Sequence, residues 1–379
     1  MRLAIDARPA LDPRRTGVGH YTRQIVRALP AAAAPDEVVA WYLDPSVAKR
    51  RRFDDVDAPN FNEHANRFPP RLFQPFTWRA GWPRLESLVG FDALLGPNFL
   101  PPPTASSGVV LVVHDLAFEV LPDTAPHHDD RWRRRFAEWL DRCAGVIVPS
   151  ESTGRDLLEH HELDDDRVHV IPHGAEPFEA PPSADVDAVR SRFAIGGPYA
   201  LFVGSIEPRK NLERLVRAFE RLGEADAWLV IAGGRTDWIP GEAERLAVQV
   251  RELPNAIHRR VVLAGYVDER ERRALVAGAT ALAYPSRYEG FGFPVLEAFA
   301  AGVPVLTSSV SSLPEVAGEA ALLVDPDDVD AIADGLRTLF DDPGLRDRLV
   351  AAGRERARSF TWGRSAARTA DVLRAAARR

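Results

Sequence analysis

Short apolar runs rich in β-branched residues recur along the chain, and most are followed by a stretch in which the apolar positions have helical spacing. Strands that alternate with amphipathic helices are typical of βαβ units, which build parallel sheets. In the first half of the chain this pattern predicts strands at residues 2–6, 38–43, 92–96, 109–115, 145–150 and 168–174. It then starts again and predicts strands at residues 199–205, 227–234, 261–267, 279–286, 304–309 and 320–325.

Two successive sets of strands and helices predict an α/β protein made of two doubly wound, Rossmann-like domains. A stretch rich in proline and acidic residues separates the two sets, and we place a linker near residues 175–197. We therefore divide the chain into a first domain at 1–175, a second domain at 176–360 and a terminal helix at 361–379, which could pack on either half. The length of 379 residues also favours two hydrophobic cores over one.

Most of the predicted strands end in small or polar residues. These residues are His114, Asp115, Ser150, His173 and Gly174 in the first half, and Gly204, Ser205, Gly233, Gly234, Gly265 and Ser286 in the second. In doubly wound sheets, ligands bind beyond the carboxyl ends of the strands. If the two halves face each other through these ends, we expect them to form one cleft.

The composition narrows the possible functions. Hydrophobic residues make up 45% of the chain and charged residues 27%, as in an ordinary globular protein. The net charge of −7 argues against a nucleic-acid partner, because proteins that bind phosphate backbones usually carry a basic excess. A single cysteine, Cys143, excludes an internal disulfide framework and predicts a buried thiol. The sequence shows neither a membrane-spanning stretch nor a signal peptide, so we expect a cytoplasmic protein.

The segment at residues 286–306 contains two glutamates, Glu289 and Glu297, around a turn of alternating glycines and aromatic residues. Pro294 suits the first position of a helix, which predicts Glu289 in the preceding loop and Glu297 in the first helical turn. The backbone amides of Phe291, Gly292 and Phe293 then gather near a helix N-terminus, where an anion is favoured. Taken singly, each glutamate could equally serve the helix dipole or stay solvated.

Two further segments place glycines or cations at the start of a helix. Gly17 and Gly19 open the helix after the first strand and would let the backbone approach a phosphate, although a tight turn explains them as well. The glycine fingerprint of dinucleotide binding is incomplete, because Thr22 stands at its last position, and this disfavours a nicotinamide enzyme. In the second half, Arg209 and Lys210 lie at the mouth of a helix, where a bound diphosphate would offset their unfavourable interaction with the dipole.

Two aromatic stretches allow more than one interpretation. The basic run at 131–143 could lie on an anionic membrane surface, but the spacing of its aromatic residues favours an ordinary helix with a core face. The proline-rich stretch at 67–85 carries aromatic residues that could receive an acceptor or simply pack in a core. Those aromatic residues are Phe73, Phe76, Trp78 and Trp82.

Five motifs follow one another along the chain. They are the glycine loop, "VVHD", "IPHG", "VGSIEPRKNL" and "EGFGFPVLEAFAAGVPV" with its two glutamates. In this order they resemble the retaining glycosyltransferases of family 4 (group 1), which have the GT-B fold. The likeness covers essentially the whole chain and is strongest from Tyr199 to Asp325. The "GSIEPRKN" segment is similar to that of mannosyltransferase-like members.

This resemblance implies an acceptor-binding first domain and a second domain that binds the nucleotide sugar. The catalytic residues it implies are Glu289, which faces the transferred sugar, His114, which reaches that sugar from the first domain, and Lys210, which holds the diphosphate. Glu297 would bind the ribose hydroxyls. The other residues implied to bind the sugar nucleotide are Gly17, Val18, Gly19, Gly204, Ser205, Arg209, Gly265, Tyr266, Val267, Phe291, Gly292 and Phe293.

The chain departs from the family pattern at two positions. Ser205 stands where many relatives carry an arginine, and Arg209 is a candidate to supply that charge. His173 stands where an asparagine is commoner, and a role as a loop histidine is at least as well supported by the sequence.

The function implied is transfer of a hexose, with retention of anomeric configuration, from a nucleoside diphosphate sugar to a saccharide or lipid-linked saccharide in polysaccharide biosynthesis. The preferred donor is GDP-mannose. We expect no metal and no further cofactor, and peripheral contact with the inner face of a membrane is left open. The alternatives are a non-hydrolysing sugar-nucleotide 2-epimerase of the same fold and a catalytically silent sugar-nucleotide binding protein.

Overall fold

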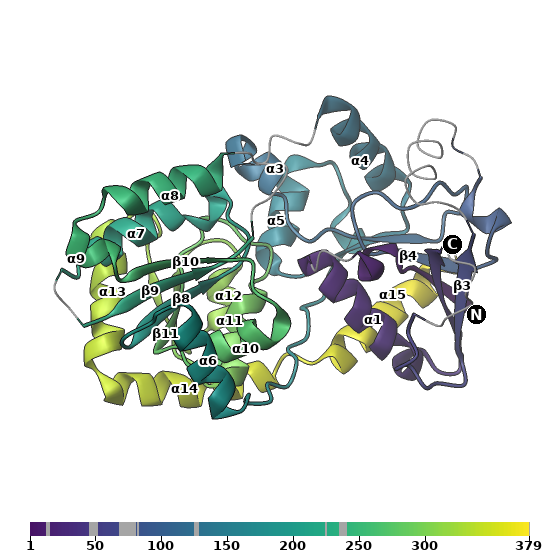
Figure 1. The fold of residues 1–379 in the computed structure, drawn as a ribbon. Coiled ribbons are helices and arrows are strands. Elements are labelled where there is room, and N and C mark those ends of the chain that lie inside the picture. The colour runs from purple at the N-terminus through teal and green to yellow at the C-terminus, as the bar shows by residue number, and fades with distance from the viewer. Residues whose placement is uncertain are drawn as a thin grey trace. The chain divides into compact units, whose positions relative to one another are not determined.

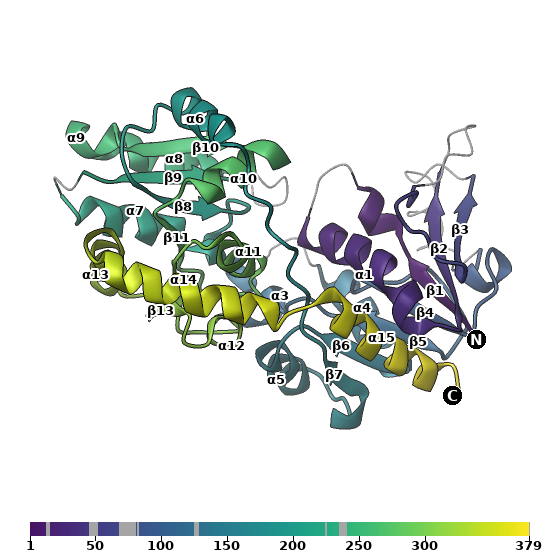
Figure 2. The ribbon, with the colours of Figure 1, turned by 90° about the horizontal axis from the view of Figure 1, so that it is seen from below.

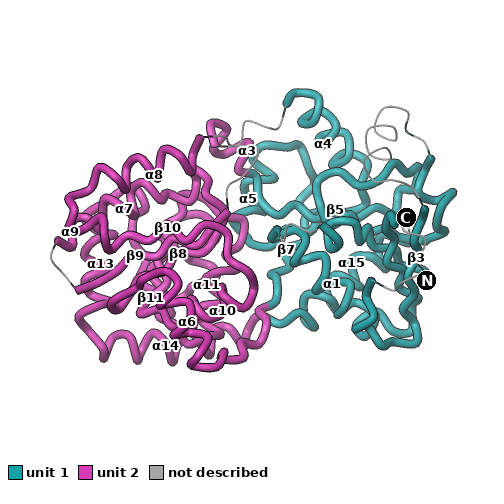
Figure 3. Tube along the Cα trace, viewed as in Figure 1, with its two compact units in different colours: residues 1–116, 129–174, 361–379 teal, residues 117–128, 175–360 magenta. Residues whose placement is uncertain are grey.

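The computed structural model describes residues 1–12, 16–44, 52–67, 81, 83–124, 129–223, 226–234 and 241–378. These residues form two compact units (Figures 1 and 3). The first unit comprises residues 1–116, 129–174 and 361–379, and the second comprises residues 117–128 and 175–360. The aromatic residues predicted between 67 and 85 lie outside the described residues.

The first unit is built on a seven-stranded parallel sheet in the order β3-β2-β1-β4-β5-β6-β7. Its strands are β1 (Arg2–Asp6), β2 (Glu37–Leu43), β3 (Phe61–Asn66), β4 (Ala93–Gly96), β5 (Val109–Val112), β6 (Gly145–Val148) and β7 (Val168–Val170). All six strands predicted in this half are confirmed, although several end earlier than expected. The edge strand β3 was not predicted, because its sequence FNEHAN is mostly polar.

Helices cover this sheet. They are α1 (Gly17–Ala33), α4 (Asp130–Arg142), α5 (Glu151–His160) and α15 (Trp362–Ala376), with 3-10 turns η1 (Arg8–Leu11), η2 (Leu85–Ser87) and η4 (Asp165–Arg167). On α4, Phe136 and Leu140 are buried, as a core face requires. Cys143, which follows α4, is a buried free thiol, as predicted.

The terminal helix α15 belongs to the first unit and lies alongside α1 (Figures 1 and 2). Its buried face consists of small residues and one leucine, which allow close approach to α1, β4 and β5. At its far end the Arg374 Nε donates to the Asp36 carboxylate at 2.8 Å. The terminal helix therefore completes a unit that begins more than 300 residues earlier in the chain.

The second unit repeats the design with a six-stranded parallel sheet in the order β10-β9-β8-β11-β12-β13. Its strands are β8 (Tyr199–Val203), β9 (Trp228–Ala232), β10 (Val261–Gly265), β11 (Ala281–Tyr284), β12 (Val305–Ser308) and β13 (Ala321–Val324). All six strands predicted in this half are therefore confirmed. In each unit the strand order reverses beside the first strand, which is the crevice where doubly wound sheets bind ligands.

The helices of the second unit are α3 (Ala117–Val120), α6 (Ser183–Arg192), α7 (Leu212–Glu220), α8 (Glu242–Glu252), α9 (Asn255–His258), α10 (Glu269–Ala277), α11 (Phe293–Ala301), α12 (Leu313–Ala317), α13 (Val329–Asp341) and α14 (Pro343–Arg358). Two 3-10 turns, η3 (Pro122–Thr124) and η5 (Pro208–Lys210), also belong to it.

Two local predictions were wrong. The proposed linker at 175–197 contains the helix α6, which packs on α10 and is tied to it by an ion pair between Asp185 and Arg270. In α11 the helix starts at Phe293, with Gly292 as its N-cap, so Glu297 lies in the second turn and not in the first. A first-turn glutamate would have complemented the helix dipole, so the dipole gives a weaker reason for a carboxylate at this position.

Candidate active site

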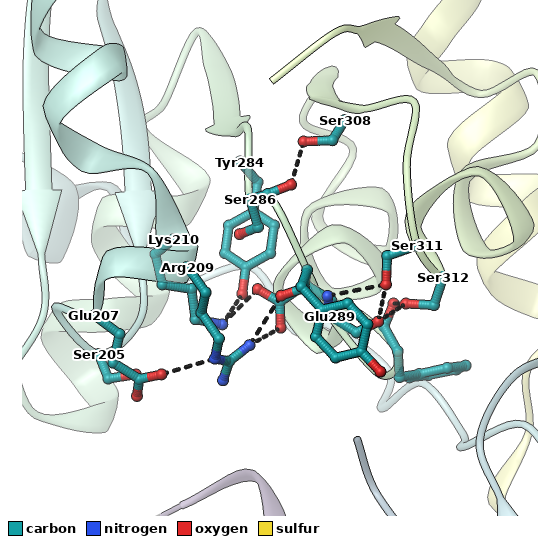
Figure 4. Close-up of polar contacts among 12 residues, drawn as sticks. Ser205, Glu207, Arg209, Lys210, Tyr284, Ser286, Glu289, Ser308, Ser311 and Ser312 are labelled. Carbon is teal, nitrogen blue, oxygen red and sulfur yellow. Dashed lines mark hydrogen bonds and ion pairs between the residues drawn. The ribbon is translucent and has the colours of Figure 1, made fainter. Parts of the chain in front are cut away.

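A buried carboxylate, Glu289, lies at the centre of a polar cluster in the second unit (Figure 4). It sits in the loop between β11 and α11 and receives hydrogen bonds from two cations. The Lys210 Nζ donates to Oε1 at 2.5 Å, and the Arg209 Nη1 donates to Oε2 at 2.8 Å. Both cations come from η5, directly after β8. The structure thus brings together three residues that the sequence had singled out.

The loop that carries Glu289 is fixed by two serines that follow β12 (Figure 4). The hydroxyls of Ser311 and Ser312 donate to the Glu289 carbonyl oxygen at 2.5 and 2.7 Å. The Glu289 amide donates back to the Ser311 Oγ at 3.1 Å, and the Ser312 hydroxyl also donates to the Phe291 carbonyl oxygen at 2.9 Å. Because several hydrogen bonds hold this backbone, the Glu289 side chain starts from a fixed position.

Glu207 holds Arg209 in place from the other side. Its Oε2 accepts from the Arg209 Nε at 2.8 Å, and its Oε1 accepts from the Ser205 hydroxyl at 2.5 Å. The Arg209 Nη1 also donates to the Tyr288 carbonyl oxygen at 3.1 Å. Ser205 therefore takes part in the cluster through Glu207 rather than as a charge, and Arg209 is the guanidinium that reaches Glu289.

The ammonium group of Lys210 is also buried. It donates to the Tyr284 hydroxyl at 2.7 Å as well as to Glu289, and Tyr284 itself is fully buried at the end of β11. Burying an ion is costly unless partners compensate it. Here the two carboxylates of Glu207 and Glu289 balance the two cations of Arg209 and Lys210.

The charges in this cluster set the ionisation of its members. Burial alone would raise the pKa of Glu289, but the charges of Lys210 and Arg209 outweigh burial and lower this pKa to about 2. Burial likewise opposes ionisation of Glu207, and the same two cations lower its pKa. For Lys210, burial and the neighbouring guanidinium lower the pKa against the pull of both carboxylates.

Close-packed glycines shape the neighbouring strand ends. A Cβ on Gly233 would stand 1.9 Å from the Gly204 carbonyl oxygen, so the backbones after β8 and β9 approach to a distance that only glycine allows. At the end of β10, Gly265 has a φ of +66°, and open space surrounds the position of its missing Cβ. Beside it the Tyr266 side chain is 72% exposed. The predicted stretch at 265–267 therefore offers an accessible aromatic ring.

Glu297 is not part of the Glu289 cluster. It lies on α11 and forms an ion pair with Arg272 of α10, which also pairs with Glu269. Burial raises the pKa of Glu297 even though Arg272 opposes this effect. Nearby, Phe291 is buried and packs edge-on against Phe293 and Phe360, so the side chains of this turn serve packing while their backbone follows the loop.

The remaining predicted residues lie in the first unit. At the start of α1, Gly17 is exposed and Val18 is half-buried. The Gly19 amide is already used, because it donates to the Thr16 hydroxyl that caps the helix. His114 follows β5, and its ring nitrogens lie 2.8 Å from the Pro97 carbonyl oxygen and 3.4 Å from the His173 Nε2. Burial lowers the pKa of His114.

Sequence reasoning missed several members of the cluster. Glu207 lies inside the quoted segment "VGSIEPRKNL", where its two-residue spacing from Arg209 could have suggested a pair. Tyr284 appeared only as part of a strand, and the serine-rich "SSVSS" after β12 carried no recognised signal. Each acts by holding a residue that the sequence had identified.

Within the described residues, no group of three or more histidine, cysteine, aspartate or glutamate side chains is placed to hold a metal ion. The absence of a metal requirement stays a prediction. In the same part of the chain, none of the helices combines the length and the apolar character needed to cross a membrane.

Two family models match the chain in succession. Residues 15–177 match the model described as Glycosyltransferase Family 4, and residues 186–356 match the one described as Glycosyl transferases group 1. The first match falls on the first unit and the second on the second unit. Together they span most of the sequence, including every predicted site residue.

Curated relatives carry related names. The chain is 27% identical over 372 residues to the O-antigen chain mannosyltransferase B of Escherichia coli, a match covering 95% of this chain and 96% of that protein. It is 32% identical over 252 residues to the D-inositol 3-phosphate glycosyltransferase of Corynebacterium glutamicum (strain R), covering 62% of this chain and 57% of the relative.

Solved structures share the fold over nearly the full length. Sucrose-phosphate synthase from Thermosynechococcus elongatus superposes with a TM-score of 0.76 at 22% identity, covering 99% of this chain and 98% of that chain. Anabaena HepE in complex with UDP and glucose superposes with a TM-score of 0.73 at 15% identity, covering 99% of both chains. At these identities the likeness establishes the GT-B fold.

Proposed function

The chain belongs to the family-4, group 1 glycosyltransferases, and from this premise we propose that it transfers a hexose from a nucleoside diphosphate sugar to a saccharide or a lipid-linked saccharide. The preferred donor is GDP-mannose, and the transfer retains anomeric configuration. The observation that carries the proposal is the buried cluster of Glu289, Lys210 and Arg209.

The chemistry of the leaving group explains why these residues suit the reaction. When the bond from the sugar to the diphosphate breaks, negative charge grows on the departing oxygen, and fixed cations lower the barrier by stabilising it. Lys210 and Arg209 are such cations. The sugar meanwhile gains oxocarbenium character, which a nearby carboxylate such as Glu289 stabilises.

The charge balance of the cluster adds a condition. Lys210 and Arg209 are neutralised by Glu289 and Glu207, so an incoming diphosphate competes with Glu289 for the same donors. Glu289 keeps both cations ordered until the donor arrives, and ordering them in advance reduces the entropy lost on binding. Departing phosphate would then take the proton of the acceptor hydroxyl at the face it leaves, so that no metal ion or enzyme base is needed.

The other assignments place the remainder of the donor. Tyr266, whose exposed ring stands beside Gly265 and Val267, would contact the nucleobase, and Glu297 would accept from the ribose hydroxyls. Gly17, Val18 and Gly19 from the first unit would contribute backbone contacts to the diphosphate. His114 would contact the donor sugar.

The choice of donor and acceptor rests on the Escherichia coli relative, whose name states mannosyl transfer to an O-antigen chain. Anabaena HepE was solved with UDP and glucose, and at 15% identity it bears on the fold alone. A lipid-linked acceptor would bring the enzyme to a membrane, and we propose peripheral contact at the cytoplasmic face.

A donor screen tests the proposal. Purified protein is incubated with GDP-mannose, UDP-glucose and related sugar nucleotides, with and without saccharide and lipid-linked acceptors, and both nucleotide release and product mass are followed. We expect acceptor-dependent release of GDP. The matched control Lys210→Met keeps the length of the side chain without its charge and should slow turnover by about 100-fold or more.

Three results would contradict the proposal in different ways. Preference for UDP-glucose would replace the donor but keep the reaction class. An epimer formed without any acceptor would identify an epimerase, and nucleotide binding without turnover would identify a silent binding protein. Wild-type rates in Lys210→Met would remove Lys210 from the site.

A further inference from the structure

Four aromatic rings from distant parts of the first unit meet in one cluster, and they belong to Tyr21, His114, His173 and Trp362. The His173 ring lies 5.4 Å from the His114 ring, and the Tyr21 ring contacts both at 5.0 and 4.6 Å between centroids. The Trp362 ring stacks on His173 with centroids 6.1 Å apart and an interplanar angle of 17°. His173 is almost completely buried, so its ring has little freedom to turn.

The partner of the His114 Nε2 fixes the position of one proton. This nitrogen lies 2.8 Å from the Pro97 carbonyl oxygen, which can only accept a hydrogen bond. The Nε2 must therefore carry the proton and donate it. In a neutral imidazole the other nitrogen, Nδ1, is then an acceptor, because the hydrogen bond made by one ring nitrogen sets the tautomer of the ring.

His173 completes this chain of hydrogen bonds. Its Nε2 lies 3.4 Å from the His114 Nδ1, and a hydrogen bond between them requires His173 to donate. Trp362 can stack on His173 only because residue 174 is a glycine. A Cβ at Gly174 would lie 2.4 Å from the Trp362 backbone nitrogen. The terminal helix α15 thus takes part in orienting a residue that follows β5.

We propose that His173 is a positioning residue that holds His114 in its Nε2–H tautomer, so that His114 acts in sugar transfer as a fixed, neutral group and not as a general acid or base. This inference rests on the proposed function, which places His114 at the donor sugar. Both ring nitrogens of His114 are engaged by the protein, and a proton cannot pass through them to a substrate without breaking one of these bonds.

The electrostatics of the pair agree with a neutral state. Burial lowers the pKa of His114, against a weaker opposing influence of Asp115. Burial lowers the pKa of His173 strongly, and positive charge on His114 or His20 would lower it further. The buried His173 imidazole and the half-buried His114 imidazole are adjacent in a poorly solvated site, where like charges repel strongly.

A pair of isosteric substitutions tests the inference. His173→Asn keeps an N–H donor, whereas His173→Asp offers only acceptors and must receive a proton from the His114 Nδ1. Histidine is labelled with 15N, and the protonated and bare ring nitrogens are identified in long-range 15N–1H spectra. We expect the Nε2–H tautomer for His114 in wild type and in His173→Asn. In His173→Asp we expect His114 to be protonated on both ring nitrogens, because the Pro97 carbonyl oxygen still requires a proton on Nε2.

Kinetics supply the functional arm of the same experiment. The kcat/KM of transfer should be nearly unchanged in His173→Asn and roughly 10-fold lower in His173→Asp, as is common when a partner that orients a histidine is lost. A protonated Nδ1 on His114 in the wild-type protein would overturn the inference. Equal kcat/KM in the two variants, although His114 gains a proton on Nδ1 in His173→Asp, would overturn the role of the pair in transfer.

The spectra keep this inference separate from the proposed function. If no sugar nucleotide serves as donor, the tautomer of His114 can still be read, and it decides the structural claim without any activity. If His173→Asp does not fold, as judged from its thermal unfolding, the wild-type and His173→Asn spectra still decide it.

Discussion

Glu289 and Lys210 are buried and Arg209 is largely so, and a substitution of any one of them therefore changes both the ionisation of the others and the stability of the fold. Removing one partner of a buried ion pair destabilises a protein far more than removing one partner of an exposed pair, because the remaining charge stays out of water. Arg209 and Lys210 both donate to Glu289, which makes the glutamate the member on which the other two depend most.

Replacing Glu289 with glutamine should make the free energy of unfolding depend less on pH below about pH 4.5. The folded-state pKa of about 2 lies below the ordinary value of 4.5, so Glu289 stabilises the folded state fully above about pH 4.5 and loses this effect as the pH falls towards 2. We expect Glu289→Gln to lower the free energy of unfolding by about 3 kcal/mol at pH 7 and by progressively less below pH 4.5.

Urea unfolding at a series of pH values measures this difference. The exposed Glu252, at the end of α8, provides the control, since Glu252→Gln should leave the curve unchanged. A constant difference between wild type and Glu289→Gln from pH 7 down to pH 3 would show that the carboxylate is not held ionised by Lys210 and Arg209.

Glu297 should contribute to donor binding through its charge. If it accepts from the ribose hydroxyls, Glu297→Gln loses a charge-assisted hydrogen bond and should raise the Kd of the donor about 10-fold. Isothermal titration with GDP-mannose or GDP measures the change. Glu269→Gln is the matched control, because Glu269 also pairs with Arg272 but lies outside the predicted site. Equal weakening in both variants would assign the effect to Arg272.

At the level of single residues, the sequence predicted Glu289, Arg209 and Lys210 from helix starts and the family resemblance. It could not predict that Lys210 and Glu289 contact each other, because 79 positions separate them and only the pairing of β8 with β11 brings them together. The tautomer of His114 could not be predicted from the sequence either. Its tautomer depends on Pro97 and His173, which meet it only in the folded sheet.

At the level of elements, the ends of the strands matter more than their middles. The strands β8 and β9 have buried apolar centres that tolerate ordinary side chains, but their carboxyl ends meet through Gly204 and Gly233. The Gly204 amide donates to the Ala232 carbonyl oxygen at 3.1 Å, and the Gly233 amide donates to the Gly265 carbonyl oxygen at 2.9 Å. This narrow contact positions the segment that leads to Arg209 and Lys210.

A methyl group on Gly233 should disrupt this contact. Its Cβ would overlap the Gly204 carbonyl oxygen, so the strand ends must move apart, and we expect Gly233→Ala to cost about 3 kcal/mol and to weaken donor binding. The control is Gly363→Ala in α15, where nothing stands within 4 Å of the new Cβ and alanine favours the helix. Thermal unfolding compares them, and equal melting temperatures would mean that β8 and β9 separate freely.

The elements themselves were largely predictable, and the exceptions have physical causes. Twelve predicted strands are present because each is an apolar run, and most of them are buried on both faces. The strand β3 was not predicted because its sequence is polar. It lies at the edge of the sheet, where a strand needs less apolar cover. The helix α6 was not predicted because the prolines and acidic residues around it are typical of linkers, and because few of its own residues are buried.

At the level of the whole molecule, the chain completes its first unit with residues from its end. The amphipathic pattern of the last segment predicted a helix but not its partner, because a face of alanines fits many surfaces equally well. Ala366, Ala370 and Leu373 are buried, and the Ser365 hydroxyl donates to the Pro172 carbonyl oxygen. The first unit therefore has its full core only when α15 is in place.

Truncation after Phe360 tests this dependence. Removing α15 uncovers apolar side chains of α1, β4 and β5, so we expect the first unit to become sensitive to proteolysis while residues 175–360 of the second unit stay resistant. Limited proteolysis with mass spectrometry of the fragments measures both. The full chain carrying Arg374→Ala loses the polar contacts of this side chain with Asp36, Asp371 and the Ala33 carbonyl oxygen but keeps the helix, and it should remain resistant throughout. Equal resistance of both units in the truncated protein would contradict the dependence.

The position of α15 also orders events on the ribosome. Residues 175–360 must be synthesised between the bulk of the first unit and its last helix, which takes about 10 to 40 seconds at typical rates of chain elongation. During that interval the nascent first unit leaves exposed the apolar side chains that α15 later covers, although its sheet is already present. The second unit can therefore finish folding first, and we expect chaperones that recognise apolar surface to bind these side chains until translation ends.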